Sequence, residues 1–324
     1  MNVAVTAVGG GAGQGVLKCF KGTEYKTIGI DPDPRAAGLY MADRGVIGPL
    51  LSDPDYIQKI IGICKDNSVE ILFIAFDAEL KVISEHRQKF IEAGITPIIS
   101  GPDTVLLSDN KWELNKFLKA NDLPYIKTAL TLDEALGIGI KYPMVLKQKM
   151  DGARSKNVFI CKNEEDVKHA ESSGVEFIYQ EYIEGPEYTC GSVTFNKKII
   201  GTIQMERELR DGDTYKAKVV DVEAINELLY TLLPKINPYG PCNVQLRMSN
   251  GIPYILEINT RCSGTTASRA LAGFNEPVLI CDYLRNGTVS YKIEDISIFR
   301  YWNEIVVPNK KVQEVSVEGF INGS

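Results

Sequence analysis

The residues best suited to chemistry lie in a predicted hairpin. Two runs of alternating apolar and polar residues, 242–248 and 254–261, flank the dipeptide Asn250-Gly251, which is typical of β-hairpin turns. Side chains alternate faces along a strand, so each run presents its polar side chains on one face. The expected polar face carries Asn243, Gln245 and Arg247 from the first strand and Glu257, Asn259 and Arg261 from the second, together with Ile255.

The register of this hairpin follows if the polar faces of the two strands lie on the same side of the sheet. A three-residue loop, 250–252, places Gln245 opposite Glu257 and Asn243 opposite Asn259. A two-residue loop would oppose Gln245 to Leu256 and mix the faces, and such a slip turns polar side chains toward the core. We therefore expect the longer loop, with Leu256 on the core face.

Three oxygen donors on one rigid face suit Mg²⁺, a hard cation that keeps water and phosphate oxygens as further ligands. The predicted ligands are Gln245, Glu257 and Asn259. Arg261 follows on the same face and is placed to hold a phosphate or a developing anionic oxygen. A solvated polar face on an edge hairpin would explain the same pattern, and these residues taken by themselves leave both readings open.

Histidine and cysteine chemistry is disfavoured. The two histidines, His86 and His169, lie in charged, helix-like stretches, where solvated side chains are expected. The seven cysteines include no C-x-x-C pair, which argues against zinc or thioredoxin chemistry. Reduced thiols in a cytoplasmic protein are the expectation.

A glycine-rich turn at residues 9–15 follows a predicted strand, 3–8, and opens a helix, 16–20. Such a turn can bind a dinucleotide. However, no set of glycines within it stands at i, i+2 and i+5, as that motif requires, so a nicotinamide oxidoreductase is disfavoured. A Walker loop is also absent from the sequence. The turn is expected to pack helix against sheet and to help hold an acceptor substrate.

The surrounding pattern predicts an α/β protein that becomes α+β toward the C-terminus. Strands and helices alternate over the first hundred residues, which favours a parallel, Rossmann-like sheet. Longer consecutive strands follow residue 187 and favour an antiparallel sheet. The predicted domains are 1–103, an N-terminal α/β domain; 104–183, a small lobe; and 184–324, a large lobe with the metal-binding sheet.

Composition limits the partners. The net charge is −6 and no apolar run approaches 18 residues, so neither a nucleic-acid partner nor a membrane is expected. The first residues lack the basic and apolar regions of a signal peptide, which again predicts a cytoplasmic location.

The hairpin resembles a known family. Residues 254–261, followed by Cys262-Ser263-Gly264-Thr265-Thr266, are similar to the E-x-N-x-R metal strand of ATP-grasp enzymes. The segment Asn243-Val244-Gln245 resembles the N-V-Q strand of the carbamoyl phosphate synthetase large subunit, where the glutamine is a metal ligand. The resemblance covers essentially the whole chain, with one ATP-grasp unit where complete synthetases have two.

Further elements appear in the family's order. The resemblance implies phosphate contacts at Lys111 and Lys147, a phosphate loop at 151–158, an adenine hinge at 180–183 and a ribose contact at Glu187. The nucleotide-binding residues so implied are Lys111, Lys147, Gly152, Ala153, Ser155, Gln180, Glu181, Tyr182, Ile183, Glu187 and Arg210.

The resemblance also implies an activity. An ATP-grasp ligase phosphorylates a carboxylate with ATP and joins the resulting acyl phosphate to an amine, releasing ADP and phosphate. Two Mg²⁺ ions, or Mn²⁺ in their place, would be held by Gln245, Glu257 and Asn259, while Arg261 and Lys147 would act in catalysis. The expected partners are a small carboxylate and a small amine, and a homodimer is consistent with the family.

Two alternatives stay open beside the ligase. The chain could be one subunit of a split carbamoyl phosphate synthetase, or a non-catalytic regulator that binds nucleotide with the same fold. Retention of Glu257, Asn259 and Arg261 argues against the regulator.

Overall fold

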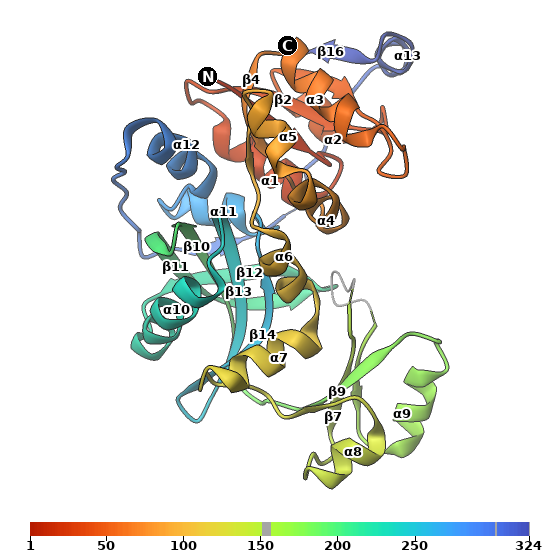
Figure 1. The fold of residues 1–324 in the computed structure, drawn as a ribbon, viewed down its shortest axis with the longest axis vertical. Coiled ribbons are helices and arrows are strands. Elements are labelled where there is room, and N and C mark those ends of the chain that lie inside the picture. Colours follow the sequence, from red (N-terminus) through yellow and green to blue (C-terminus); the bar gives the residue numbers. More distant parts are fainter. Residues whose placement is uncertain (151–156, 302, 324) are drawn as a thin grey trace.

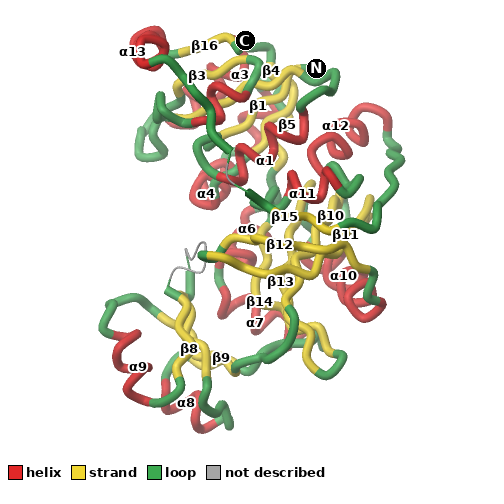
Figure 2. The backbone as a smooth tube through the Cα atoms, turned by 180° about the vertical axis from the view of Figure 1, so that it is seen from behind, coloured by secondary structure: helices red, strands yellow, loops and turns green. Residues whose placement is uncertain are grey.

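The computed structural model describes residues 1–150, 157–301 and 303–323. Within these residues the chain forms an N-terminal lobe, a large lobe and a small lobe that protrudes from the end opposite both termini (Figures 1 and 2). The predicted phosphate-loop residues Gly152, Ala153 and Ser155 lie outside the described residues.

The N-terminal lobe is built on a sheet with strand order β16-β3-β2-β1-β4-β5. Its strands β1 to β5 pair in parallel, which confirms the predicted parallel sheet. The strands are β1 (Asn2–Thr6), β2 (Lys26–Asp31), β3 (Arg44–Ile47), β4 (Val69–Phe73) and β5 (Thr96–Ile98). The helices are α1 (Gly11–Phe20), α2 (Ala37–Met41), α3 (Tyr56–Asp66), α4 (Asp77–Glu85) and α5 (Arg87–Glu92).

Alternation along β1 explains why both faces of this sheet are covered. Val3 and Val5 pack in one apolar cluster with Val16 of α1, whereas Ala4 packs in a second cluster with Ile57 of α3. Neighbouring side chains point to opposite faces, so helices are required on both sides.

The edge of this sheet is completed from the other end of the chain. Strand β16 (Phe320–Asn322) follows α13 (Asn309–Glu318) and pairs antiparallel with β3. The predicted range 184–324 therefore supplies a strand to the N-terminal sheet, and both termini lie at that lobe (Figure 1).

The small lobe carries an antiparallel sheet with strand order β6-β9-β7-β8. Its strands are β6 (Thr128–Ala129), β7 (Met144–Gln148), β8 (Val158–Cys161) and β9 (Phe177–Glu181). Helices α8 (Leu132–Gly137) and α9 (Glu164–Glu171) supply Ala135, Val167 and Ala170 to its apolar core.

The large lobe is an antiparallel sheet in the order β14-β13-β10-β11-β12-β15, as the longer strands predicted. Its strands are β10 (Glu187–Phe195), β11 (Lys198–Arg210), β12 (Asp213–Val220), β13 (Gly240–Ser249), β14 (Ile252–Asn259) and β15 (Ser297–Phe299). Around it lie α6 (Pro102–Asp109), α7 (Lys111–Ala120), α10 (Glu223–Ile236), α11 (Thr266–Leu271) and α12 (Glu276–Asn286).

Helices α7 and α10 cover one face of the large sheet. Leu118 of α7 and Leu229 of α10 pack in one cluster with Val244 and Leu246 of β13. The opposite face of β13 is therefore left for Asn243 and Gln245, as the alternation predicted.

The hairpin pairing was predicted correctly, but the loop was not. Gln245 pairs with Glu257 and Asn243 with Asn259. The loop has two residues, because Ser249 already pairs with Ile252. Asn250 and Gly251 both have positive φ, 51° and 79°, which a two-residue hairpin turn of this kind requires.

A β-bulge reconciles the short turn with the observed pairs. The register shifts between Gln245 and Leu246, which pairs with Ile255, so Leu256 is the extra residue on β14. The prediction placed Leu256 on the core face and Ile255 on the polar face; both placements were wrong. Ile255 is buried in the core cluster, while Leu256 lines a pocket, because a bulge carries two residues opposite one and re-aims the side chains beyond it.

We expect Gly251→Ala to lower the free energy of unfolding by about 1–2 kcal/mol, because φ is +79° and a Cβ is disfavoured in the left-handed region. Gly62→Ala is the matched control. Gly62 lies inside α3 with open space at its Cβ position, so this change should raise stability by about 0.5–1 kcal/mol. Urea denaturation measures both; equal effects of the two substitutions would contradict the assigned turn.

Candidate active site

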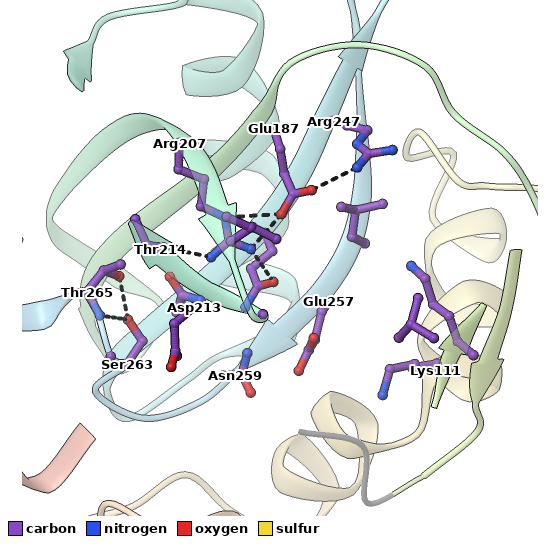
Figure 3. Close-up of a pocket in the computed structure, with 18 of the residues that line it drawn as sticks. Lys111, Glu187, Arg207, Asp213, Thr214, Arg247, Glu257, Asn259, Ser263 and Thr265 are labelled. Carbon is purple, nitrogen blue, oxygen red and sulfur yellow. Dashed lines mark hydrogen bonds and ion pairs between the residues drawn. The ribbon is translucent and has the colours of Figure 1, made fainter. Parts of the chain in front are cut away.

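A pocket of about 550 Å³ opens where the three lobes meet. The N-terminal lobe contributes the glycine turn, at Gly10 and Gly11, and residues 75–77. The small lobe contributes β7 and β9, and the large lobe contributes the polar faces of β10, β13 and β14. The predicted hairpin face therefore forms one wall (Figure 3).

Glu257 and Asn259 of β14 present their side chains to this pocket (Figure 3). In the part of the chain that the structure describes, the Glu257 carboxylate makes no hydrogen bond or ion pair. The Asn259 oxygen has one long contact, 3.5 Å, with Nη2 of Arg261. Carboxylate and amide oxygens exposed in this way fit a hard divalent cation.

The third predicted metal ligand is arranged differently. The Gln245 Oε1 atom accepts a hydrogen bond of 2.8 Å from Nη2 of Arg207, so the structure gives this oxygen an arginine partner. Among the described residues no group of three or more histidine, cysteine, aspartate or glutamate side chains could hold a metal ion. A metal here would depend on Glu257, Asn259 and ligands from outside the chain.

Lys147 and Lys111 face the metal strand from the other side. Lys147 lies on β7, next to strand β9, and Lys111 begins α7, where its backbone N–H donates to the carbonyl of Lys149, 3.1 Å away. Figure 3 places Lys111 across from Glu257. Two cations opposite an acid create a strip of positive potential beside the metal strand.

The pKa of Lys147 is lowered to about 8. Burial is the largest cause, because it penalises the charged ammonium. The carboxylate of Glu257 opposes this shift, while the like charge of Lys111 adds to it. At neutral pH the ammonium form still predominates, so Lys147 remains a cation that can meet an anionic ligand.

Glu187, the predicted ribose contact, is held between two arginines (Figure 3). Its Oε1 accepts from Nη2 of Arg207 at 2.7 Å, and its Oε2 accepts from Nη2 of Arg247 at 3.0 Å. Arg247 also donates to the carbonyl of Ile183 at 3.0 Å. This chain of ion pairs fixes the end of the predicted adenine hinge to the large sheet.

The hinge residues 180–183 lie at the end of β9 and line the pocket. Gln180 is buried and donates through Nε2 to Thr128 Oγ1 at 3.0 Å. Its Oε1 atom is buried without a hydrogen-bond partner in the described residues. A buried acceptor left in this way is costly unless a ligand supplies the donor.

Arg261 is bound to the N-terminal lobe. Its Nε and Nη2 donate to Oδ1 and Oδ2 of Asp77, both at 2.6 Å. This is the two-bond geometry that guanidinium groups form with carboxylates. Arg261 also lines the pocket, with one edge of its guanidinium occupied by Asp77 and Nη1 donating to the carbonyl of Cys262 at 3.0 Å.

One residue predicted to bind the nucleotide lies outside the pocket, and the pocket also contains residues that were not predicted. Arg210 does not line the pocket; its side chain is 62% exposed and its guanidinium lies over the ring of Tyr215. Asp77 was missed because its partner is 184 residues away, and no local pattern signals such a contact. Arg300 also lines the pocket and was not singled out from the sequence.

Comparisons with known proteins agree with the fold. Residues 4–98 match the family described as "PylC-like, N-terminal domain", and residues 173–304 match "ATP-grasp in the biosynthetic pathway with Ter operon". The fold is similar to N5-carboxyaminoimidazole synthetase from Staphylococcus aureus complexed with ADP, with TM-score 0.70 and 18% identity over 86% of this chain and 76% of that one. It is also similar to biotin carboxylase from Campylobacter jejuni, with TM-score 0.69 and 18% identity over 90% and 73% of the two chains.

By these matches and by its fold the chain is similar to ATP-grasp proteins, with one ATP-grasp match at residues 173–304. Its sequence is similar to the carbamoyl phosphate synthase large chain of Thermoanaerobacter sp. strain X514, with 25% identity over 74% of this chain and 23% of that one. The Thermotoga petrophila large chain is 21% identical over 90% and 30%. The chain thus spans about a quarter to a third of the length of these relatives. No helix among the described residues is long and apolar enough to cross a membrane.

We expect Glu187→Gln to lower the free energy of unfolding by about 3 kcal/mol, because it leaves two largely buried arginines beside a neutral side chain. The matched control is Glu24→Gln, which removes the carboxylate of an exposed pair with Arg285 and should change stability by less than about 1 kcal/mol. Guanidinium chloride denaturation compares them. Equal losses would show that Glu187 does not hold this network together.

Proposed function

We propose that this chain is an ATP- and Mg²⁺-dependent ligase that joins a carboxylate to an amine through an acyl phosphate. One observation carries the proposal. Glu257 and Asn259 face Lys111 across a pocket that Lys147 also lines, which is the arrangement needed to hold a triphosphate between metal ions and ammonium groups.

The nucleotide is expected to lie along the β7–β9 side of the pocket. The unpartnered Gln180 oxygen is an acceptor that an exocyclic amino group of adenine could satisfy. From there the phosphates would run toward Lys111 and Lys147 and then to the metal strand. Structural neighbours named as complexes with ADP and with magnesium ADP support a nucleotide in this fold.

The residues present fit a magnesium site of the expected kind. Glu257 and Asn259 would bind the ion directly, and Mn²⁺ could replace it, because both ions accept oxygen ligands. Gln245 could join them only by exchanging its hydrogen bond with Arg207. The bound ion would neutralise phosphate charge; two ions, as the resemblance implies, would extend this along the triphosphate.

The residues of the chain would position the reactants and supply positive charge to the phosphate groups. In the first step a carboxylate oxygen bonds to the γ-phosphorus of ATP and the bond to ADP breaks. In the second step the amine nitrogen bonds to the acyl carbon, phosphate leaves, and the nitrogen loses a proton. Lys147 and Lys111 would orient the phosphates, while the positive charge of Arg261 would stabilise charge on the transferring group. The segment 151–158 remains the predicted phosphate loop.

A subunit of a split carbamoyl phosphate synthetase is the second candidate. The chain spans only part of its curated relatives. One of them, from Methanocaldococcus jannaschii, is itself described as a C-terminal section and is 27% identical over 55% of this chain. Bicarbonate-dependent release of ADP that requires a second subunit would favour this candidate. Nucleotide binding without turnover under every condition would favour a regulator.

Screening carboxylate–amine pairs for release of ADP and phosphate with Mg²⁺-ATP tests the main proposal. Glu257→Gln should reduce turnover on an active pair by at least about 100-fold, because a neutral amide holds Mg²⁺ less well than a carboxylate. Glu70→Gln, at an exposed position on β4, is the control and should retain activity. Undiminished turnover by Glu257→Gln would overturn the assigned site.

The affinity for Mg²⁺-ATP should fall as pH rises above about 8. The folded-state pKa of Lys147 is about 8, so the free protein loses this ammonium group above that pH, whereas triphosphate binding favours the charged form. The dissociation constant should increase by about tenfold per pH unit until the pKa of the bound state is reached. Calorimetric titration between pH 7 and 9.5 measures this.

Lys147→Arg provides the matched variant, because a guanidinium group stays charged throughout this range. Its dissociation constant should vary much less with pH. An equally steep pH dependence in the variant would assign the titration to another group.

A further inference from the structure

A fully buried ion pair packs against the same face of the large sheet as Asn243. Nη1 of Arg269, on α11, donates to Oε1 of Glu276, on α12, at 2.7 Å. The two side chains are 1% and 0% exposed. The second carboxylate oxygen accepts from Thr266 Oγ1 at 2.7 Å. Burying two charges is costly, and the proposed nucleotide site does not explain this pair.

The ion pair reaches the pocket through Asn243. Nη2 of Arg269 donates to Thr189 Oγ1 at 3.0 Å and also to Asn243 Oδ1. Thr189 Oγ1 donates to the same Asn243 oxygen at 2.7 Å. An arginine can only donate hydrogen bonds, so the atom of the Asn243 amide that faces it must be the oxygen.

This fixes the direction of the Asn243 amide. With Oδ1 turned to Arg269 and Thr189, the Nδ2 group is left without a partner in the described part of the chain. Asn243 lines the pocket although the residue is 1% exposed. It stands directly opposite Asn259 in the hairpin register. A buried amide therefore directs its N–H donor beside the metal strand.

The neighbouring strand is shaped to admit this arrangement. Gly191 of β10 pairs with Asn243. A Cβ at Gly191 would lie 2.3 Å from Oε1 of Glu276 and 2.6 Å from Cδ of Arg269, which is closer than heavy atoms can approach. Glycine here makes room for the ion pair directly behind Asn243.

We propose that Asn243 is a further catalytic residue, whose Nδ2–H group donates a hydrogen bond to an oxygen of the group transferred from ATP, and that Arg269 and Glu276 are positioning residues that set its direction. The inference rests on the proposed function, because it requires a phosphoryl group next to Asn259. A donor fixed before the reaction lowers the cost of charge that develops on that oxygen.

Binding of two probes tests this without knowledge of the natural substrates. Mg²⁺-ADP reports the nucleotide site, and Mg²⁺-ADP with aluminium fluoride adds a mimic of the transferring phosphoryl group. Asn243→Ala should bind Mg²⁺-ADP with wild-type affinity and bind the aluminium fluoride complex about 100-fold more weakly than wild type. Equal affinity of wild type and variant for the aluminium fluoride complex would overturn the assignment.

Glu276→Gln tests the positioning role. It should weaken the aluminium fluoride complex several-fold with little effect on Mg²⁺-ADP, whereas a purely structural role would weaken both ligands together or neither. Asn115→Ala is the control. Asn115, on α7, is also buried, and its side chain donates a hydrogen bond to the carbonyl of Ile126. This substitution should leave the ratio of the two affinities unchanged. Thermal unfolding of each variant confirms that the protein tested is folded.

The outcomes separate this inference from the proposed function. If wild-type protein binds neither probe, the proposed function fails and the role of Asn243 falls with it. If wild type binds both probes and Asn243→Ala matches it on both, the proposed function stands and the inference about Asn243 is wrong.

Discussion

The pairing of β13 with β14 is the constraint on which the pocket depends. Its bulge after Gln245 brings Leu256 and Glu257 to the pocket side while Ile255 and Ile258 remain in the core. Without that extra residue the two-residue turn would carry Glu257 to the wrong face, because side chains alternate strictly along a regular strand. The metal-strand geometry is thus set by a local irregularity of the backbone, held in place by the apolar cluster behind it.

Charge pairing organises the rest of the pocket. Glu187 is bound by Arg207 and Arg247, and Arg261 is bound by Asp77. The Glu187–Arg207 pair joins the consecutive strands β10 and β11, whereas the Glu187–Arg247 pair joins residues 60 apart in sequence. The Arg261–Asp77 pair joins residues 184 apart and ties the N-terminal lobe to the large sheet. Low effective dielectric strengthens such contacts, so the lobes are held together by the same groups that surround the proposed triphosphate.

Much of the fold could be predicted from the sequence, because hydrophobic alternation and turn residues report local structure directly. The parallel N-terminal sheet, the antiparallel large sheet and the Gln245–Glu257 pairing were recovered in this way. The two-residue turn was not, because a bulge leaves no distinct signal in apolar alternation. The partners of Gln245, Glu187 and Arg261 were not predictable either, since side-chain direction at a given register depends on long-range neighbours that no spacing rule contains.

The closure of the N-terminal sheet by β16 has a consequence for how the protein is made. Strand β3 is synthesised early, whereas its partner at residues 320–322 emerges only after both other lobes. Until then the β3 edge has unpaired backbone groups, which can pair with other chains. The edge of the first sheet is therefore completed only when residues 320–322 have docked against β3.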